Sequence, residues 1–352
     1  MQGDIGFGVV GLGMGRHHCN AIRVAEGARL VAVCDADEER LRIVAEEHGC
    51  ETYTDFQKFL ANGSVDVVNI ATPSGLHAEF AILAARAGKH VIVEKPADIA
   101  VEPIDEMIEA CEKNNVKAAG IFQARFDPLN IRIRAAIDAG CLGKLIGIHG
   151  HLPWYRAQDY YSGIHGSWKG TWNMDGGGSL MNQGVHTVDL LQWFGGAVKT
   201  VFGQFGIFAH DIESEDQVAA VLCFTSGALG TLYTTTCCYP GYNQRITLYG
   251  ERGSIVKEEG KLISWKMIDD PNCVEENDLI SQYGANAEKD SRAADPMAAS
   301  FSGHAEIVTD MVAAIREDRN PVISLASARN AVEIINSIYA SGRKGVPMTL
   351  GD

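Results

Sequence analysis

The sequence predicts two domains, an α/β Rossmann domain followed by an α+β domain with a largely antiparallel open sheet. Residues 5–16 are typical of a buried strand that leads through a glycine-rich turn into a helix. Strand and helix patterns alternate as far as about residue 125, whereas closely spaced strands with tight turns follow residue 200. At 352 residues the chain is long enough for two packed cores, so we place the domains at 1–125 and 126–352.

In the first domain, strands and helices alternate after the opening strand, turn and helix. β-Branched runs indicate the strands, and helical periodicity closed by a glycine indicates a helix. Such alternation implies right-handed crossovers and a parallel sheet, whose ligand lies beyond the carboxyl ends of the strands. The expected elements are strand 30–34, helices 38–48 and 56–60, strand 65–71, helix 77–87, strand 91–93, helix 103–114 and strand 117–121.

The second domain has a different order of elements. Turn residues such as Ser226-Gly227 separate its strands, which favours an antiparallel sheet. The last helix has an apolar stripe at i, i+3/i+4 spacing, and we expect it to pack back on the Rossmann domain. The expected elements are helix 129–139, strand 144–150, loop 152–178, helix 180–194, strands 200–209, 216–224, 228–236, 245–249, 253–257 and 261–266, loop 269–300, and helices 302–316 and 325–341.

Charge and cysteine content exclude several classes of protein. The formal net charge of −15 argues against nucleic-acid and anionic-membrane partners, because both attract basic surfaces. No signal peptide precedes the first strand, and no apolar run approaches the length of a membrane span. The nine cysteines are scattered and odd in number, which fits reduced thiols better than a disulfide framework. We therefore expect a cytoplasmic protein.

The glycine-rich turn after the first strand predicts dinucleotide binding, because its backbone N–H groups can approach a pyrophosphate at the positive end of a helix dipole. Asp35 ends the next strand, about 20 residues past the glycines, where an acidic side chain binds the adenosine ribose diol. This carboxylate would repel a 2′-phosphate, so NAD is expected rather than NADP. Arg16 occupies the third fingerprint position, with Gly15 one place earlier. The cofactor residues expected here are Gly11, Gly13, Met14, Gly15, Arg16 and Asp35.

Two side chains are candidates for proton transfer. Lys95 follows a strand end, on the same edge of the sheet as the glycine turn, where an ammonium group can polarise a substrate hydroxyl. His186 follows the glycines 176–178 in a predicted helix, and Asn182 shares one face of that helix. Histidine is the usual side chain that takes a proton from an alcohol during hydride transfer. A surface lysine and a satisfied helical histidine are the structural alternatives.

The loop 152–178 is rich in aromatic and hydrogen-bonding side chains. Aromatic planes suit the C–H face of a polyhydroxylated ring, although such a loop can also be packed by its own aromatics. No metal site is expected, because His149 and His151 lack a third ligand and the acidic cluster 210–216 suits a solvated turn. The residues expected to bind substrate are Asn182, Asp189, Arg156, Tyr155, Lys169 and Trp172.

Taken together, these motifs give the chain a resemblance to the Gfo/Idh/MocA oxidoreductase family, the glucose–fructose oxidoreductase and inositol dehydrogenase group. The resemblance covers essentially the whole length. It implies a sugar, cyclitol or sugar-nucleotide substrate, NAD or NADP as cofactor, and a C-terminal sheet that forms dimers or tetramers. The motifs that carry it are Gly11-Leu12-Gly13, Thr72-Pro73 with His77, Glu94-Lys95-Pro96, and Gly176-Gly177-Gly178 leading to His186 and Asp189.

By position, the resemblance implies that Lys95 and His186 are the catalytic pair. Many inositol dehydrogenase-like members carry Asp at the position of Asn182; because an amide cannot accept a proton, we expect Asn182 to orient a substrate hydroxyl. The residues that the resemblance places near the cofactor are Thr72, Pro73, His77, Glu94 and Gln123.

The function implied is NAD-dependent hydride transfer between the nicotinamide and a secondary alcohol of a sugar, cyclitol, glycoside or sugar nucleotide. His186 would take the hydroxyl proton while Lys95 stabilises the developing alkoxide. Two alternatives stay open. One is an NAD-dependent glycosidase that works by transient oxidation and elimination, and the other is a non-catalytic NAD-sensing protein. A homodimer or homotetramer is expected.

Overall fold

The computed structural model describes residues 3–162, 167–270, 274–284 and 302–351. The chain divides into two compact units. We call them the Rossmann unit, made of Met1–Gln123, Asn173–Gly176 and Phe301–Val332, and the sheet unit, made of Ala124–Trp172, Gly177–Ser300 and Glu333–Asp352. The predicted domains 1–125 and 126–352 stay a prediction, because compactness does not establish which segments fold alone.

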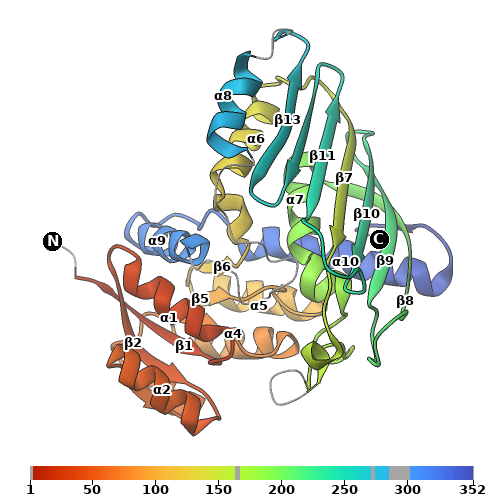
Figure 1. Cartoon of the computed structure of the whole chain (residues 1–352). Coiled ribbons are helices and arrows are strands. Elements are labelled where there is room, and N and C mark those ends of the chain that lie inside the picture. Colours follow the sequence, from red (N-terminus) through yellow and green to blue (C-terminus); the bar gives the residue numbers. More distant parts are fainter. Residues whose placement is uncertain (1–2, 163–166, 271–273, 285–301, 352) are drawn as a thin grey trace. The chain divides into compact units, whose positions relative to one another are not determined.

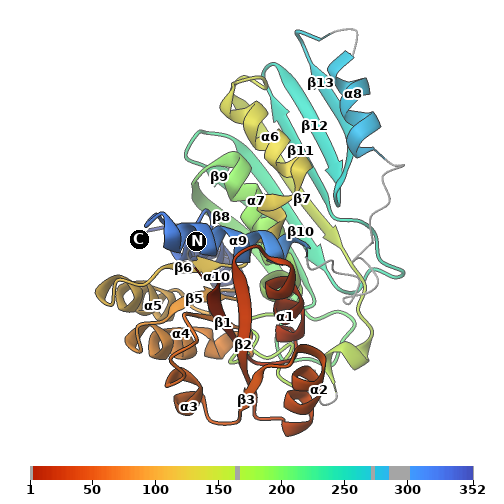
Figure 2. The same cartoon turned by 90° about the vertical axis from the view of Figure 1, so that its left-hand side faces the viewer.

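The Rossmann unit has a six-stranded parallel sheet in the order β3-β2-β1-β4-β5-β6. In Figure 2, helices α1 and α2 lie on one side of the strands, and α4 and α5 lie on the other. Its strands are β1 (Ile5–Val10), β2 (Ala28–Cys34), β3 (Glu51–Tyr53), β4 (Val67–Ile70), β5 (His90–Val93) and β6 (Ala118–Gly120). Its helices are α1 (Gly15–Val24), α2 (Glu38–His48), α3 (Phe56–Leu60), α4 (His77–Arg86), α5 (Val101–Lys113) and α9 (Ser302–Arg316).

Local chemistry explains where these elements begin and end. The central strands β1, β4 and β5 are apolar on both faces, as a sheet covered on both sides requires, and Val9, Ile70 and Ile92 have no exposed surface. The carboxylate of Asp37 caps α2 by accepting hydrogen bonds from two backbone N–H groups. Gly49 ends the same helix in the left-handed conformation, at φ +67°.

A segment from the end of the chain completes the Rossmann unit. Helix α9 packs with α1 (Figure 1), and Ser324 forms an antiparallel bridge with Ala119 of β6. The backbone N–H of Gly120 also donates to the carbonyl of Ile323. Helix α10 (Leu325–Lys344) begins here, so its first residues belong to this unit.

The sheet unit has eight strands in the order β13-β12-β11-β7-β10-β9-β8-β14. All neighbouring pairs are antiparallel except β7 and β10, which are parallel. The parallel sheet predicted for the first domain and the largely antiparallel sheet predicted for the second are therefore both confirmed. Helices α6 (Pro128–Asp138) and α7 (Val185–Gly195) pack on each other, and α7 packs on β7. The strands are β7 (Leu145–Pro153), β8 (Val198–Gly206), β9 (Gln217–Phe224), β10 (Leu229–Thr235), β11 (Arg245–Gly250), β12 (Gly253–Glu258), β13 (Lys261–Met267) and β14 (Met348–Thr349).

Two sequence predictions need correction. The predicted loop 269–300 contains helix α8 (Val274–Tyr283), while 285–300 lies outside the described residues. The predicted helix 180–194 is a π-helical segment, Ser179–Gly184, followed by α7. In a π-helix the hydrogen bonds join residues five apart, so each turn contains more residues than a turn of an α-helix. The i, i+4 spacing therefore does not place Asn182 and His186 on one face.

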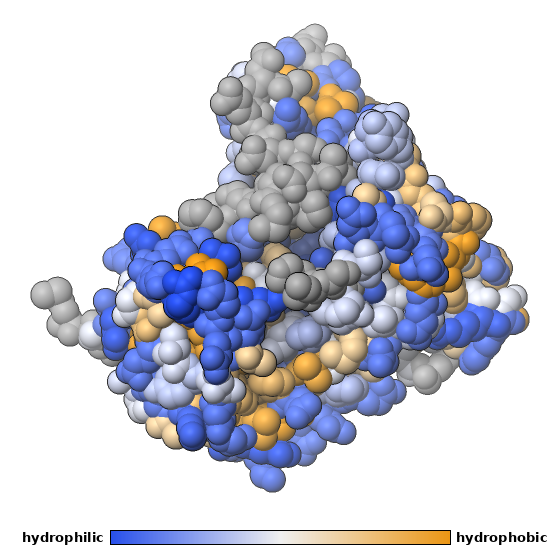
Figure 3. Space-filling model, turned by 60° about the horizontal axis from the view of Figure 1, so that its bottom comes forward, coloured by the Kyte–Doolittle hydropathy of each residue, from blue (hydrophilic) through white to orange (hydrophobic). Residues whose placement is uncertain are grey.

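The surface of the molecule is dominated by polar residues on the face drawn in Figure 3, where hydrophobic residues form scattered patches. Within the described part of the chain, every helix falls short of the length and apolar character that crossing a bilayer requires.

Candidate functional site

The carboxyl edge of the Rossmann sheet gathers most of the residues predicted to bind the cofactor. Parallel strands end at the same edge, and the order of the sheet reverses between β1 and β4, where ligands of such folds bind. The loops after successive strands carry the glycine turn (β1), Asp35 (β2), Thr72 and Pro73 (β4), Lys95 (β5) and Gln123 (β6).

The glycine turn is one residue shorter than the usual fingerprint. Gly11 has φ +84°, and a Cβ there would lie 2.5 Å from the carbonyl oxygen of Ala71, so only glycine fits. A Cβ on Gly15 would lie 2.9 Å from Cγ1 of Val9. Gly15 therefore provides the close helix–strand packing that the third glycine of the fingerprint normally provides.

Gly13 and Met14 of this turn are open to a ligand. Apart from the adjoining residues, no heavy atom of the described chain lies within 4 Å of a Cβ built on Gly13, and the Met14 side chain is exposed. Helix α1 has no acidic residue in its first turn, which suits a bound anion. The side chain of Arg16 points to the surface, with Nη2 3.8 Å from the Glu47 carboxylate.

Asp35 is turned towards the glycine loop. Its Oδ2 accepts a hydrogen bond from the N–H of Leu12 at 2.5 Å, and its Oδ1 accepts one from the N–H of Asp37 at 2.8 Å. Arg40, which the sequence analysis overlooked, has Nη1 3.7 Å from Asp35 and Nε 3.3 Å from Asp37. Its place in the first turn of α2, after an acidic strand end, is the signal that could have identified it.

Two buried polar atoms at the same edge test whether these residues fit a dinucleotide. Oγ1 of Thr72 and Oε1 of Gln123 are buried, and neither has a hydrogen-bond partner among the described residues. An unsatisfied buried polar group costs about 1–3 kcal/mol, so a ligand that offers N–H or O–H groups would be favoured here. The open Gly13 and the start of α1, which suits an anion, add to this fit. Together these residues fit NAD, which would supply the hydride acceptor when bound.

His77 joins the two loops that flank this edge. Its Nδ1 lies 2.7 Å from the carbonyl oxygen of Pro96, and its Nε2 lies 2.8 Å from that of Thr72. Because both ring nitrogens have backbone partners, the side chain shapes the loops around Pro73 and Lys95.

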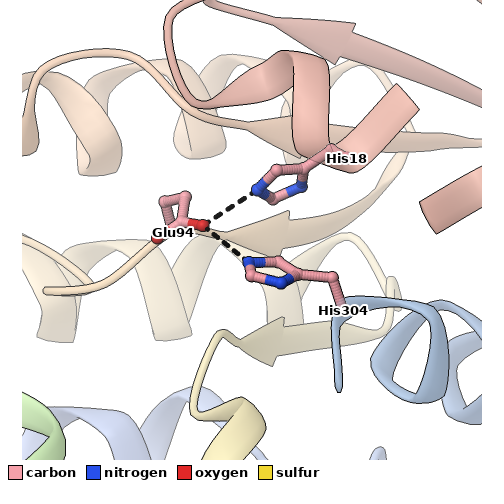
Figure 4. Close-up of side chains that lie close together, drawn as sticks. All are labelled: His18, Glu94 and His304. Carbon is pink, nitrogen blue, oxygen red and sulfur yellow. Dashed lines mark hydrogen bonds and ion pairs between the residues drawn. The ribbon is translucent and has the colours of Figure 1, made fainter. Parts of the chain in front are cut away.

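Lys95 is half-buried, and Glu94 beside it is 5% exposed. Oε2 of Glu94 accepts a hydrogen bond from the Lys95 N–H at 2.9 Å. Oε1 is contacted by Nε2 of His18 at 2.9 Å and by Nε2 of His304 at 3.2 Å (Figure 4). Burial would raise the pKa of Glu94, but the two histidines outweigh it, so the pKa lies well below its usual value.

The sheet unit contains the second group of predicted residues. His186 is half-buried in the first turn of α7, and Asn182 is buried in the π-helical segment. Oδ1 of Asn182 accepts a hydrogen bond from Nε2 of Gln183 at 2.7 Å, and the Tyr160 hydroxyl lies 3.3 Å away. Oε1 of Gln183 accepts one from Nη2 of Arg156 at 3.1 Å. The sequence analysis missed Gln183, although it adjoins Asn182.

The aromatic loop contributes both to this network and to packing. Nζ of Lys169 lies 3.8 Å from the centre of the Tyr160 ring. Trp172 instead packs against Tyr339 and Phe205, with ring centres 5.2 and 5.9 Å apart, and Tyr155 packs against Tyr239. Lys169 therefore lies with the polar network, whereas Trp172 and Tyr155 have packing partners of their own.

Asp189 is fully buried and paired with Arg125. The two side chains make a bidentate ion pair, with Nε–Oδ2 at 2.9 Å and Nη2–Oδ1 at 2.5 Å. Burial raises the pKa of Asp189 by more than Arg125 lowers it, so this pKa lies above its usual value. Both oxygens have partners, so this geometry gives Asp189 a supporting role for α7, and substrate binding by Asp189 stays a prediction.

A buried carboxylate fixes the start of the π-helical segment. Glu215 accepts hydrogen bonds from the N–H groups of Gly178, Ser179 and Leu180, each at 3.0 Å, from the Ser179 hydroxyl and from the Tyr339 hydroxyl at 2.6 Å. Glu215 and its neighbour Asp216 have no exposed surface, so the prediction of a solvated turn over 210–216 was wrong for these two residues.

Models of known protein families match residues in both units. A family model described as an oxidoreductase family with an NAD-binding Rossmann fold matches residues 5–121, and the corresponding C-terminal domain model matches 131–256. The chain is 31% identical to the myo-inositol 2-dehydrogenase of Thermotoga maritima, over 71% of this chain and 74% of that protein. It is 30% identical to the scyllo-inositol 2-dehydrogenase (NAD(+)) of Bacillus subtilis, over 72% and 74%.

A solved structure extends the similarity to the full length. The WlbA dehydrogenase of Bordetella pertussis, in complex with NADH and UDP-GlcNAcA, has a TM-score of 0.87 and 30% sequence identity, and the match covers 100% of this chain and 99% of that one.

Proposed function

The chain belongs to the Gfo/Idh/MocA family of NAD-dependent oxidoreductases, and we propose that this dehydrogenase of CH–OH groups oxidises a secondary alcohol on a polyhydroxylated ring. The observation that carries the proposal is the carboxyl edge of the Rossmann sheet. There the glycine turn, Asp35 and a half-buried Lys95 lie on loops of one sheet edge. The names of the related proteins support a cyclitol, sugar or sugar nucleotide as the substrate class.

In the proposed reaction, bound NAD would serve as the acceptor of the hydride from the carbinol carbon, and the O–H proton leaves as the carbonyl forms. His186 takes this proton as general base. The ammonium group of Lys95 stabilises the negative charge that develops on the oxygen. Asn182 orients a neighbouring hydroxyl, because its amide can donate and accept hydrogen bonds but cannot take up a proton.

The remaining predicted contacts complete the proposal. The backbone of Gly13, Met14 and Gly15 binds the pyrophosphate, and Asp35 binds the adenosine ribose. Thr72 and Gln123 offer their unsatisfied oxygens to the cofactor. On the substrate side, Arg156 and Lys169 bind ring hydroxyls. A cytoplasmic location stays a prediction.

The test is an absorbance screen for NAD reduction against inositols, free sugars, glycosides and sugar nucleotides. Lys95→Met and His186→Ala should each abolish turnover with the best substrate while NAD binding, followed by fluorescence titration, is retained. Arg252→Lys, a conservative change at an exposed ion pair with Asp269, is the matched control and should keep full activity. Unchanged turnover in Lys95→Met or His186→Ala would refute the assigned role of that residue.

We also propose that a second copy of the chain covers the outer face of the eight-stranded sheet. Phe202 and Val221 are cross-strand partners, and Leu229 and Tyr249 flank Gly147 on the same face. These four side chains are between 40% and 56% exposed, which is unusual for large hydrophobic residues on adjoining strands. Val221→Lys with Leu229→Lys should shift the mass measured by light scattering to that of a monomer. A wild-type monomer would contradict this proposal.

A further inference from the structure

Three buried side chains from distant segments meet in the Rossmann unit (Figure 4). His18 comes from α1, Glu94 from the loop that follows β5, directly before Lys95, and His304 from the start of α9. Their residues are 1%, 5% and 5% exposed. A carboxylate this deeply buried needs compensating partners, because burying an unpaired charge is strongly unfavourable.

The hydrogen bonds in this cluster have a definite direction. Nδ2 of the fully buried Asn69 lies 3.1 Å from Nδ1 of His18 and donates to it. The proton of a neutral His18 ring is then on Nε2, from which it is donated to Oε1 of Glu94 at 2.9 Å. Nε2 of His304 donates to the same oxygen at 3.2 Å. The other oxygen of Glu94 is left to accept the backbone N–H of Lys95.

Two histidines and a glutamate could also hold a metal ion, since their ligand atoms lie within 4.8 Å of one another. A metal, however, needs unprotonated ligand nitrogens. The contact from Asn69 instead places a proton on the nitrogen of His18 that faces Glu94. Hydrogen bonds account for both oxygens of Glu94 and both ring nitrogens of His18, and they favour a clamp over a cation site.

We propose that His18 and His304 act through Glu94 as positioning residues that hold Lys95 in its reactive place. This inference rests on the proposed catalytic role of Lys95. The chain of contacts runs from two helices to a single carboxylate, and from that carboxylate to the Lys95 backbone. Side chains at a reacting centre must be held closely, because a misplacement of about 1 Å can cost 10²-fold in rate.

The same clamp links Lys95 to the cofactor loops. His18 lies one turn after Gly15, at the start of the helix that follows the glycine turn. A Cβ on Gly303, the neighbour of His304, would lie 2.8 Å from Cβ of Gln123, so α9 also contacts the loop after β6. The elements that shape the proposed NAD site therefore also fix the residue that acts on the substrate.

The test compares Glu94→Gln, His304→Leu and His304→Gln with His48→Gln, a control at a buried side chain elsewhere in the same unit. Glu94→Gln and His304→Leu should lower kcat about 10- to 100-fold, with little change in NAD affinity. His304→Gln keeps an N–H donor to Glu94 and should recover most of this loss. The control should retain wild-type kcat. Thermal unfolding of each variant separates loss of fold from loss of rate.

A double variant distinguishes this inference from the proposed function. If Glu94 acts through Lys95, adding Glu94→Gln to Lys95→Met should cause no further loss of the residual rate. Should Lys95→Met be fully active, the catalytic role proposed for Lys95 fails, and the clamp with it. Should it be inactive while Glu94→Gln and His304→Leu behave like the control, only the clamp is refuted. One equivalent of metal in the purified protein, lost in His304→Leu, would also overturn the clamp.

Discussion

Gly15 leaves no room for a side chain between α1 and β1, and filling this space should lower both stability and NAD affinity. In Gly15→Ala the new methyl group would lie 2.9 Å from Cγ1 of Val9, closer than carbon atoms normally approach. Overpacking of a core by one methyl group typically costs about 1–3 kcal/mol. For a folding unit of about 150–250 residues, about 1 kcal/mol lowers Tm by roughly 2–4 °C, so a fall of about 2–12 °C is expected if the Rossmann unit unfolds by itself.

The same change should weaken NAD binding, because α1 must move outwards and carries the N–H groups of the glycine turn with it. The assay is thermal unfolding together with a fluorescence titration of NAD. Val24→Ala is the matched control: this residue ends α1 and is 60% exposed, and surface changes of this kind stay within about ±0.5 kcal/mol.

A compensating substitution makes the test specific. Val9→Ala removes the methyl groups that Gly15→Ala would meet, so the double variant should be more stable than the sum of the two single effects predicts. If Gly15→Ala keeps the Tm and NAD affinity of the wild type, or if Val24→Ala is the more damaging change, the assignment of the third fingerprint role to Gly15 is refuted.

Three further predictions concern buried carboxylates. Glu215→Gln should lower the free energy of unfolding by about 1–3 kcal/mol for each backbone N–H left unsatisfied, measured by denaturant unfolding; equal stability would contradict the role of Glu215 as an anchor. Asp189→Asn should lower the free energy of unfolding by about 3–5 kcal/mol, because Arg125 would keep a buried charge without its partner. A decrease smaller than that caused by breaking an exposed ion pair would contradict this expectation. The lowered pKa of Glu94 means that its contribution to stability is present above its ordinary pKa of 4.5 and is lost as the pH falls below that value. The difference in the free energy of unfolding between the wild type and Glu94→Gln should therefore become smaller in acid. A difference that grows in acid would contradict this expectation.

The sequence was sufficient where a residue's role follows from its local pattern. The alternation of strands and helices predicted the parallel sheet, although not its short edge strand β3, and the position of Lys95 after a strand end predicted its place at the carboxyl edge. The register between strands, including the parallel pair β7–β10, depends on contacts between distant segments, which periodicity does not encode. The π-helical segment Ser179–Gly184 was missed for a related reason, because its turn is held by Glu215, which lies more than thirty residues later in the chain.

Two acidic residues show what a local pattern leaves open. The polar run around Glu215 is typical of a solvated turn, which is wrong for this residue, and the expected place of Glu94 near the cofactor stays a prediction. In the structure both carboxylates are buried. Glu94 accepts the backbone N–H of Lys95, and Glu215 accepts N–H groups at the start of the segment that leads to His186. Side-chain donors complete both sites: His18 and His304 for Glu94, and Ser179 and Tyr339 for Glu215.

These two sites solve the same physical problem. A loop or a helix start that must hold a reactive side chain has backbone N–H groups without partners. A buried carboxylate can bind several of them at once, and its charge makes each bond stronger than one to a neutral acceptor. The arrangement is rigid only if the carboxylate is itself held from other elements, which requires residues far away in the sequence, such as His304 and Tyr339. For this reason, the residues that touch the reacting atoms can be predicted from local motifs, whereas the residues that hold them in place become visible only in the folded chain.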